Sequence, residues 1–241
     1  MNIYIVSNDE RYKYLCDALK AAGHNTTISE PQRLENADAV IFSVRDELTR
    51  EEYEKVLLGL NKETIVFSGG QAIINELFSG RVVNYSQNED FLLKNAYLTA
   101  EAFLSIWHKE VKESPLGKSV LIVGYGRIGK SLAKIFSNLG ASVNIYARRE
   151  AVREEVKNDG YVPVLLEEFS GFDAIINTAP SVVFDKKIIN EIPSKTYLFD
   201  LASNCGFEDS SKVIFALGLP GKILPKSAAN VIYDTIKELL S

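Results

Sequence analysis

The sequence has little cysteine and no long apolar run. Among its 241 residues there are only two cysteines, Cys16 and Cys205. We expect them to fall in different lobes, which argues against a disulfide and favours a reducing compartment. No stretch approaches the ~20 apolar residues that a membrane-spanning helix needs. The first residues also lack the basic and apolar regions of a signal peptide. We therefore expect a cytoplasmic protein with no membrane partner.

The chain also lacks a concentration of charge of one sign. It carries 27 basic and 32 acidic residues, a formal net charge of −5, and neither kind forms a long block. Nucleic-acid-binding proteins usually present a basic face, so we expect no nucleic-acid partner. The two cysteines and the two histidines, His24 and His108, do not have the spacing of metal ligands. We accordingly expect no metal site.

Alternation of apolar and amphipathic segments predicts two α/β lobes, each a doubly wound parallel sheet. In the first half we expect strands at residues 2–6, 26–28, 39–44 and 64–67, helices at 9–22 and 49–60, and a short helix and strand ending near residue 85. In the second half we expect strands at residues 119–123, 142–146, 174–177, 196–200 and 212–216, and helices at 127–139 and 227–240.

A long helix is expected to join the two lobes. Residues 88–111 are predominantly helical in pattern, with a break expected near Tyr97, and Ser114-Pro115-Leu116-Gly117 then interrupts the chain. We predict four parts: a substrate-side lobe at 1–94, a connecting helix at 95–116, a Rossmann domain at 117–225, and a C-terminal helix at 226–241 that packs back on the first lobe.

A glycine-rich loop opens the second lobe. It follows a β-branched strand and precedes an amphipathic helix, which is the context that a dinucleotide-binding loop requires. The first glycine allows a tight turn, the second lets the backbone approach a pyrophosphate, and the third lets the helix pack close to the strand. The phosphates then meet free N–H groups at the helix start. The loop consists of Gly124, Tyr125, Gly126, Arg127, Ile128 and Gly129.

The end of the second strand of this lobe favours NADP over NAD. NAD-binding proteins usually place Asp or Glu there, to bind the ribose 2′-hydroxyl. This chain instead has Tyr146-Ala147-Arg148-Arg149, and a guanidinium can pair with a 2′-phosphate through its planar fork. Arg148 is the leading candidate and Arg149 the second. Glu150 is the competing candidate for a ribose contact, and a solvated basic helix start is the alternative interpretation.

Several segments, in the same order from about residue 64 onward, resemble the A subunit of bacterial dipicolinate synthase. That family is NADP-linked, two-lobed and related to the 2-hydroxyacid and alanine dehydrogenases. The matching segments are 67–69, 95–101, the glycine loop, 146–148, 177–181, 200–203, 218–222 and 225–226. The chain departs from the family in having Ala102 where glycine is usual, and residues 204–209 in place of a glycine-rich stretch. Its first lobe also looks short for the family.

The resemblance implies oxidation of dihydrodipicolinate to dipicolinate with NADP in the cytoplasm of a sporulating cell. The partner that it implies is a separate, flavoprotein-like B subunit. We also expect a homo-oligomer. Further cofactor contacts are expected from the matched segments, at Thr178, Ala179, Pro180, Ala202 and Ser203.

The substrate that the resemblance implies is a dianion, a small dicarboxylate, which calls for N–H donors and cations. Ser68, Gly69 and Gly70 at a strand end are candidate donors, and Asn95 and Thr99 are candidates to bind a carboxylate. Lys222 and Lys226 are candidate cationic partners, and Glu101 is a candidate general base. Each has a structural alternative: Thr99 as a helix cap, Asn95 in a turn, Glu101 as a helix N-terminal carboxylate, and Lys226 in a solvated first turn.

The positions of the two histidines narrow the set of reactions that the chain could catalyse. Hydroxyacid dehydrogenases use a histidine late in the chain as acid–base partner, whereas His24 and His108 both precede the second lobe. A lactate- or glycerate-type reaction is therefore disfavoured, because its alcohol proton needs a base poised near neutrality. Two alternatives stay open beside a dipicolinate synthase-like activity: a related oxidoreductase acting on another cyclic imine or amino acid, and a non-catalytic NADP-binding partner subunit.

Overall fold

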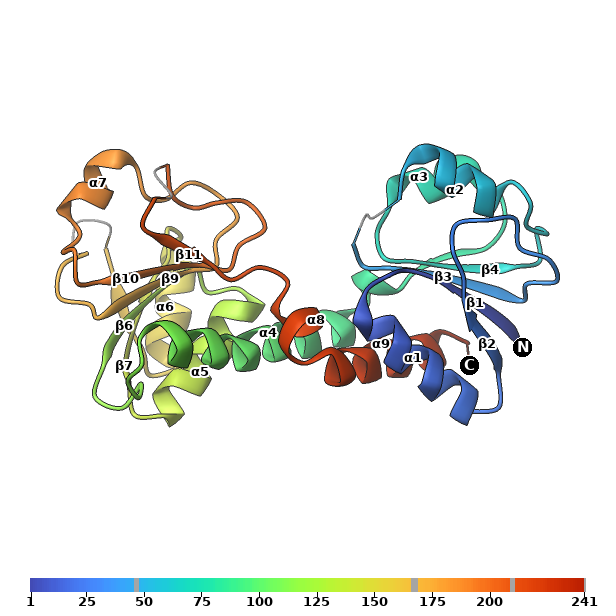
Figure 1. Ribbon diagram of the computed structural model, residues 1–241. Helices are drawn as coiled ribbons and strands as arrows, with labels where there is room; N and C mark the ends of the chain where they lie inside the picture. The colour runs from blue at the N-terminus through green and yellow to red at the C-terminus, as the bar shows by residue number, and fades with distance from the viewer. Residues whose placement is uncertain (46–47, 166–168, 209–210, 241) are drawn as a thin grey trace. The chain divides into compact units, whose positions relative to one another are not determined.

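The chain forms two compact α/β units, each with its own parallel sheet. The computed structural model describes residues 1–45, 48–165, 169–208 and 211–240. Unit 1 comprises Met1–Asn95 and Pro220–Ser241, and unit 2 comprises Ala96–Leu219. Figure 1 shows the two sheets with helices on both faces of each. The predicted fold class is confirmed.

Unit 1 contains a parallel sheet whose five strands in the described residues run in the order β2-β1-β3-β4-β5. The central strands β1, β3 and β4 are mostly apolar, because helices cover both faces of the sheet. All four residues of β3 are buried, for example. The strands are β1 (Asn2–Val6), β2 (Asn25–Ile28), β3 (Ala39–Phe42), β4 (Ile65–Ser68) and β5 (Val82–Asn84).

Helices from both ends of the chain cover this sheet. On one face α1 (Glu10–Ala21) packs with α9 (Pro225–Leu240), and Ala229, Ile232 and Ile236 of α9 join the same core as the first strands. The C-terminal helix thus packs on the first unit, as expected. The other face carries α2 (Arg50–Leu57), which begins with a capping box at Thr49, and α3 (Ala72–Leu77). A 3₁₀ turn, η1 (Tyr85–Gln87), follows β5.

One continuous helix, α4 (Glu89–Glu110), runs from unit 1 into unit 2. The break expected near Tyr97 is wrong. The helix contains no glycine or proline, the residues that most strongly interrupt helices. Tyr97 points to solvent, while Ala96 and Ala100 on either side are buried. The aromatic ring is therefore accommodated without a change in the backbone.

Unit 2 has the strand order β11-β10-β9-β6-β7-β8, all parallel. Counted from β6, this is the order 6-5-4-1-2-3 of a Rossmann fold, in which the direction of progression reverses between β6 and β9. A ligand is expected beyond the carboxyl ends of the strands at that point. The strands are β6 (Ser119–Val123), β7 (Ser142–Tyr146), β8 (Val162–Val164), β9 (Ala174–Asn177), β10 (Tyr197–Asp200) and β11 (Val213–Phe215).

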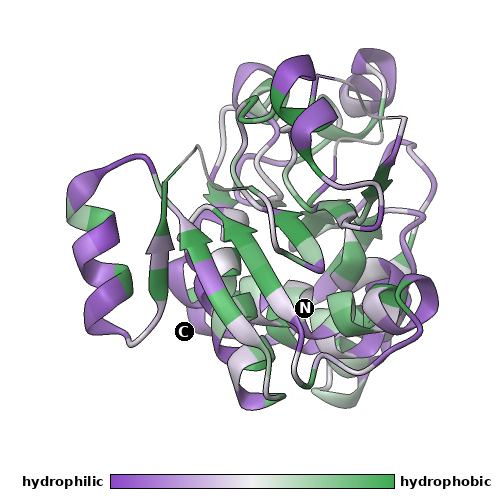
Figure 2. Ribbon diagram, turned by 90° about the vertical axis from the view of Figure 1, so that its left-hand side faces the viewer, coloured by the Kyte–Doolittle hydropathy of each residue, from purple (hydrophilic) through white to green (hydrophobic). Residues whose placement is uncertain are grey.

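The core of unit 2 is rich in aromatic rings. Trp107 of α4 is fully buried and packs edge-on against Phe136, with their ring centroids 5.0 Å apart, and it stacks near Phe199. Figure 2 shows the strands as largely hydrophobic ribbon and the covering helices as mixed. The helices are α5 (Arg127–Asn138), α6 (Glu150–Asn158), α7 (Lys186–Glu191) and α8 (Leu219–Ile223), the last of which lies at the division between the units.

Candidate functional site

The glycine loop has the geometry that a dinucleotide requires. Gly124 follows β6 with φ +95°, a conformation that side chains disfavour. Gly126 is the N-cap of α5 and has no side chain to cap the first N–H groups of the helix. A Cβ at Gly126 would meet no atom within 4 Å, so protein packing does not demand glycine there. Open space above the backbone at this residue fits the close approach of a phosphate.

Thr178 and Gly129 both lie against the backbone of the glycine loop. The Thr178 hydroxyl donates to the carbonyl oxygen of Val123 at 2.9 Å. A Cβ at Gly129 would lie 2.2 Å from the carbonyl oxygen of Gly124, so the helix can approach the loop only with glycine at this position. Thr178 was expected to contact the cofactor, whereas its hydroxyl here supports the loop.

A cavity of about 300 Å³ extends from the glycine loop to the end of β7. Both arginines expected to select NADP, Arg148 and Arg149, line it and are exposed. Glu150 begins α6 and is not among the lining residues. The cavity is lined by Val123, Gly124, Tyr125, Gly126, Tyr146, Ala147, Arg148, Arg149, Val152, Ala179 and Val183.

Tyr125 connects the glycine loop to the far end of α6. Its hydroxyl donates to Asp159 Oδ2 at 2.6 Å, and the ammonium of Lys130 lies 5.3 Å from the centre of its ring. Burial and the hydrogen bond to the Asp159 carboxylate raise the pKa of Tyr125 above its usual value. The phenol therefore stays neutral at physiological pH and acts as a donor that fixes the loop against α6.

Two buried polar residues, Asn177 and Asp200, organise the neighbouring strand ends. Asp200 Oδ1 accepts from Asn177 Nδ2 at 3.0 Å and from the Ala202 amide at 2.9 Å, while Oδ2 accepts from the Gly206 amide at 2.7 Å. Both residues lie in segments that resemble the family, but the sequence alone assigned neither of them a role. The available signal was a polar residue at the carboxyl end of each of two apolar strands.

The other expected cofactor contacts are distributed around the same strand ends. Ala179 lines the cavity with the loop residues, whereas Pro180 and Ser203 are exposed outside its lining and Ala202 is buried beside Asp200. Arg127 and Ile128 lie in the first turn of α5. Of the segment 204–209, which departs from the family, Asp209 lies outside the described residues.

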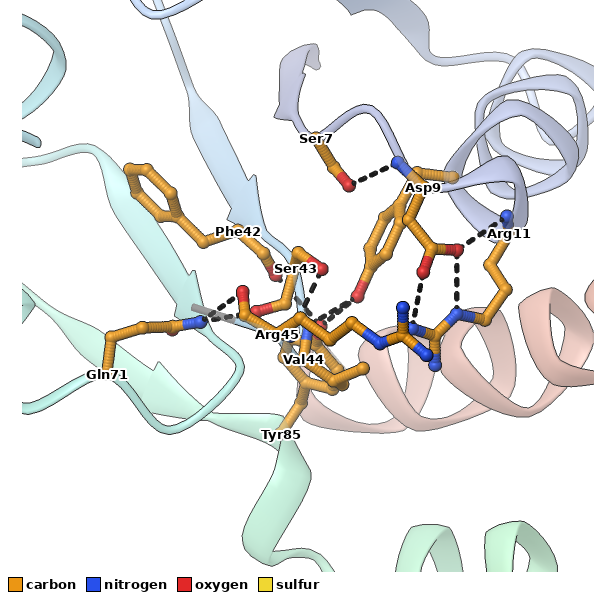
Figure 3. A network of polar contacts seen from close by, with 10 residues as sticks. Ser7, Asp9, Arg11, Phe42, Ser43, Val44, Arg45, Gln71 and Tyr85 are labelled. Carbon is orange, nitrogen blue, oxygen red and sulfur yellow. Dashed lines mark hydrogen bonds and ion pairs between the residues drawn. The ribbon is translucent and has the colours of Figure 1, made fainter. Parts of the chain in front are cut away.

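Unit 1 has its own polar cluster at the carboxyl ends of its strands (Figure 3). Arg11 forms a bidentate ion pair with Asp9, with N–O distances of 2.8 and 2.7 Å, and only 6% and 7% of the two side chains is exposed. Burial alone would raise the pKa of Asp9, but the hydrogen bonds and charge of Arg11 lower it below its usual value. The pair is therefore ionised at neutral pH.

Two buried tyrosines hold the turn that follows β3. The hydroxyls of Tyr12 and Tyr85 lie 2.6 Å apart, Tyr85 donates to the carbonyl of Phe42 at 2.8 Å, and Tyr12 accepts from the amide of Val44 at 2.8 Å. Tyr12 is thus the donor between the two hydroxyls. Burial raises the pKa of Tyr85 well above its usual value, so both phenols stay protonated.

The segment expected to offer N–H groups to the substrate uses them internally. Gly69 donates to Gln71 Oε1 at 3.0 Å and Gly70 donates to Ser68 Oγ at 3.0 Å. Gln71 in turn donates to the carbonyl of Ser43 at 2.6 Å. A Cβ at Gly69 would lie 2.0 Å from that same carbonyl oxygen. Gly69 is thus explained by the close approach of two turns and Gly70 by its φ of +113°, and in this structure both amides donate within the protein.

The three candidates on α4 do not share one environment. Asn95 and Thr99 are four residues apart and so lie on one face of the helix, with Asn95 half-buried and Thr99 buried. Glu101 is exposed on a different face. The helix begins at Glu89, so neither the cap proposed for Thr99 nor the N-terminal carboxylate proposed for Glu101 is correct. Asn95 belongs to unit 1, whereas Thr99 and Glu101 belong to unit 2.

Lys222 lines an open cavity of about 490 Å³ in unit 1, together with Asp9, Arg45 and Gly221. A Cβ at Gly221 would lie 2.8 Å from Nε of Arg11, so Arg11 packs closely against α8, the short helix that carries Lys222. Lys226 is exposed in the first turn of α9. A larger cavity of about 840 Å³ lies at the opposite, amino ends of the strands. It contains none of the candidate residues, and ligands of such sheets bind at the carboxyl ends.

Within the described ranges, no three His, Cys, Asp or Glu side chains are grouped so that they could hold a metal ion. The helices in these ranges are all too short or too polar to cross a membrane.

Comparisons with known proteins agree with this geometry. Residues 94–195 match the family model "D-isomer specific 2-hydroxyacid dehydrogenase, NAD binding domain". The A subunit of dipicolinate synthase from Bacillus subtilis (strain 168) is 29% identical over 172 residues, which are 67% of this chain and 58% of that relative. The match therefore spans less than two thirds of the curated relative.

Solved structures show the same fold over the whole chain. The A subunit of dipicolinate synthase from Bacillus halodurans superposes with a TM-score of 0.84 at 23% identity, covering 100% of this chain and 97% of that one. Its counterpart from Bacillus subtilis gives a TM-score of 0.81 at 22% identity, covering 100% and 95%. D-lactate dehydrogenase from Escherichia coli gives 0.67 at 14% identity, covering 100% and 96%.

The chain thus has two α/β units, and the second combines a Rossmann strand order and a glycine loop with a match to the NAD-binding domain of the 2-hydroxyacid dehydrogenases. Among the proteins compared, it is similar to the A subunit of dipicolinate synthase in sequence and in fold, and the resemblance inferred from the sequence is confirmed.

Proposed function

We propose that this chain is an NADP-dependent dehydrogenase that oxidises dihydrodipicolinate to dipicolinate. The observation that carries the proposal is the cavity shared by the glycine loop and the two arginines at the end of β7. A 2′-phosphate carries a charge that one or more guanidinium groups can bind in bidentate fashion. The names of the relatives supply the substrate.

The residues present fit the cofactor. The amides at the start of α5 and the open space above Gly126 would hold the pyrophosphate, while Arg148 and Arg149 would hold the 2′-phosphate. When bound, the nicotinamide would supply the hydride acceptor. The overall change is the loss of one hydride and one proton from the dihydropyridine, which leaves an aromatic ring. The contribution of the protein is therefore mainly positioning and charge management.

The substrate would be bound through its carboxylates. In unit 1, Lys222 is an exposed cation beside the ionised Asp9–Arg11 pair, and Asn95 is a half-buried amide on α4. We propose both as carboxylate contacts, with Thr99 and Lys226 as further candidates. Ser68, Gly69 and Gly70 become supports of the neighbouring turn in this proposal, because their donors are engaged. Glu101 stays a candidate base, although its side chain is exposed.

Calorimetry with NADP and NAD tests cofactor choice. Wild-type protein should bind NADP more tightly, and Arg148→Asp should lose about 10–100-fold of NADP affinity, the equivalent of one charge-assisted hydrogen-bonded contact. Arg50→Asp is the matched control, because it reverses the charge of an exposed arginine in unit 1. An unchanged preference in Arg148→Asp would remove Arg148 from the proposal. Failure of wild-type protein to bind either dinucleotide would refute the proposal altogether.

Turnover measurements test the reaction. Freshly generated dihydrodipicolinate and NADP should give dipicolinate, measured with and without a B subunit, the partner that we propose for this chain. Lys222→Ala and Asn95→Ala should lose turnover while NADP binding is retained. Normal turnover in these variants would reject their roles. A protein that binds NADP and never turns over, with or without the partner, would instead be the non-catalytic subunit. Turnover of another cyclic imine alone would indicate the related oxidoreductase.

A further inference from the structure

We propose that Arg153 is a positioning residue that sets the selectivity of this chain for NADP. The inference rests on the proposed function, because it concerns how the turn carrying Arg148 and Arg149 is held. Arg153 lies in the first turn of α6, four residues after the N-cap Arg149. Side chains on a helix lean toward its N-terminus, so a long side chain at this position reaches back over the turn.

The guanidinium of Arg153 binds two consecutive peptide carbonyls of that turn. Its Nη1 donates to the carbonyl oxygen of Ala147 at 3.1 Å and to that of Arg148 at 2.6 Å. No other hydrogen bond or ion pair of the Arg153 side chain is found in the described part of the chain. Hydrogen bonds from a charged donor are about twice as strong as neutral ones. The side chain of Arg153 therefore fixes the orientation of two successive peptide planes.

These two peptides decide where the selecting arginines project. Arg148 follows the first of the two carbonyls and Arg149 the second, so rotation of either peptide changes the φ or ψ of Arg148 and redirects its side chain. In the observed orientation of the two peptides, their carbonyl oxygens face Arg153, and Arg148 and Arg149 line the cavity next to the glycine loop. A carbonyl oxygen turned toward a 2′-phosphate would repel it, and Arg153 prevents that orientation.

Arg153 is not itself placed as a phosphate ligand. Its neighbour Val152 lines the cavity, whereas Arg153 is half-buried outside the lining. The glycine loop, which would hold the pyrophosphate common to both dinucleotides, makes no hydrogen bond to Arg153 among the described residues. Loss of Arg153 should therefore weaken the contact that only NADP makes and spare the contacts that NAD and NADP share.

The test compares the dissociation constants for NADP and NAD by calorimetry in four proteins. Arg153→Met keeps the length of the aliphatic stem and removes the donors, and should weaken NADP binding by about tenfold, a change equal to one such contact, with NAD binding within about twofold of wild type. Arg153→Lys keeps a cation that can reach these carbonyls and should regain most of the loss. Lys157→Ala, one turn further along α6, removes a positive charge that pairs with Glu154 and leaves the turn untouched. It should change neither constant by more than about twofold.

A purely structural role predicts a different pattern. Equal weakening of both cofactors in Arg153→Met, no weakening of either, or no recovery in Arg153→Lys overturns the proposal. Thermal unfolding followed by the fluorescence of Trp107 confirms that unit 2 of each variant is folded. A wild-type protein without preference for NADP overturns the cofactor assignment itself. A wild-type preference that Arg153→Met leaves unchanged overturns only the role of Arg153.

Discussion

Replacement of Asp200 should destabilise unit 2 strongly. The carboxylate is fully buried at the carboxyl end of β10 and accepts three hydrogen bonds, two from backbone amides and one from Asn177. These bonds hold the turn after β10 and connect it to the end of β9. In Asp200→Ala all three donors lose their acceptor, and the backbone donors of Ala202 and Gly206 have no side chain that can rotate to another partner.

The magnitude follows from the three donors. A buried donor left without an acceptor costs about 1–3 kcal/mol, so three such donors set an upper range of about 3–9 kcal/mol. Removal of a buried charge recovers part of this, because the desolvation of the carboxylate is no longer required. We expect Asp200→Ala to lower the free energy of unfolding of unit 2 by about 3–5 kcal/mol, a large part of the 5–15 kcal/mol typical of a domain.

The single tryptophan of the chain provides the assay. Trp107 is fully buried in unit 2 and packs against Phe136 and Phe199, the residue before Asp200. Its fluorescence in a urea titration therefore reports the unfolding of unit 2 and not of unit 1. The midpoint should fall, and an unchanged slope would show that the loss is one of stability.

Asp200→Asn is the matched control. Asparagine keeps the shape and can keep its oxygen toward Asn177 and Ala202, but it places an NH₂ group opposite the amide of Gly206. One bond of three is lost, so we expect about 1–3 kcal/mol. The reasoning would be refuted if Asp200→Ala cost less than Asp200→Asn, or if neither variant moved the midpoint.

Three further predictions concern other parts of the two units. Arg11 lowers the pKa of Asp9, so the stabilisation from this pair is present above the ordinary carboxyl pKa of about 4 and is lost as the pH falls through the lower pKa of the folded state. Urea titrations followed by far-ultraviolet circular dichroism measure the difference in unfolding free energy between wild type and Asp9→Asn. This difference should shrink below about pH 4, and a difference that stays constant with pH would contradict the prediction. Tyr85→Phe leaves the buried carbonyl of Phe42 without its 2.8 Å donor and should cost about 1–3 kcal/mol in the same titration; a cost near zero would show that another donor replaces it. Gly129→Ala would place a methyl group 2.2 Å from a carbonyl oxygen of the glycine loop and should weaken the binding of NAD and NADP alike, whereas calorimetry showing wild-type affinity would mean that the loop can shift.

The sequence predicted the strands of the Rossmann unit well, because fully buried strands are continuous apolar runs bounded by turn residues. Residues 119–123, 142–146 and 174–177 were expected as strands and are β6, β7 and β9. The short edge strand β8, with Pro163 at its centre, was missed because three residues carry too little pattern. The helix break at Tyr97 was wrong because an aromatic residue within a helical pattern is compatible with an uninterrupted helix.

The candidate site divides in the same way. The glycines of a short local motif, such as Gly124 and Gly126, could be found from their spacing. Residues that act through long-range contacts could not. Gly69 is explained by a carbonyl 26 residues away in sequence, in Ser43. No local sequence pattern predicts a partner of this kind, because the two turns meet only after the sheet has formed.

Unit 1 is assembled from two distant stretches of chain, and this has a consequence for synthesis. Ala229, Ile232 and Ile236 of α9 complete the core that α1 and the first strands begin. A ribosome releases residues 1–95 long before these side chains, so the apolar side of α1 stays uncovered during synthesis. Unit 2 is one uninterrupted stretch of 124 residues, from Ala96 to Leu219, and can fold in that interval. Unit 1 is thus begun first and completed last, and a truncation within α9 should destabilise unit 1 more than unit 2.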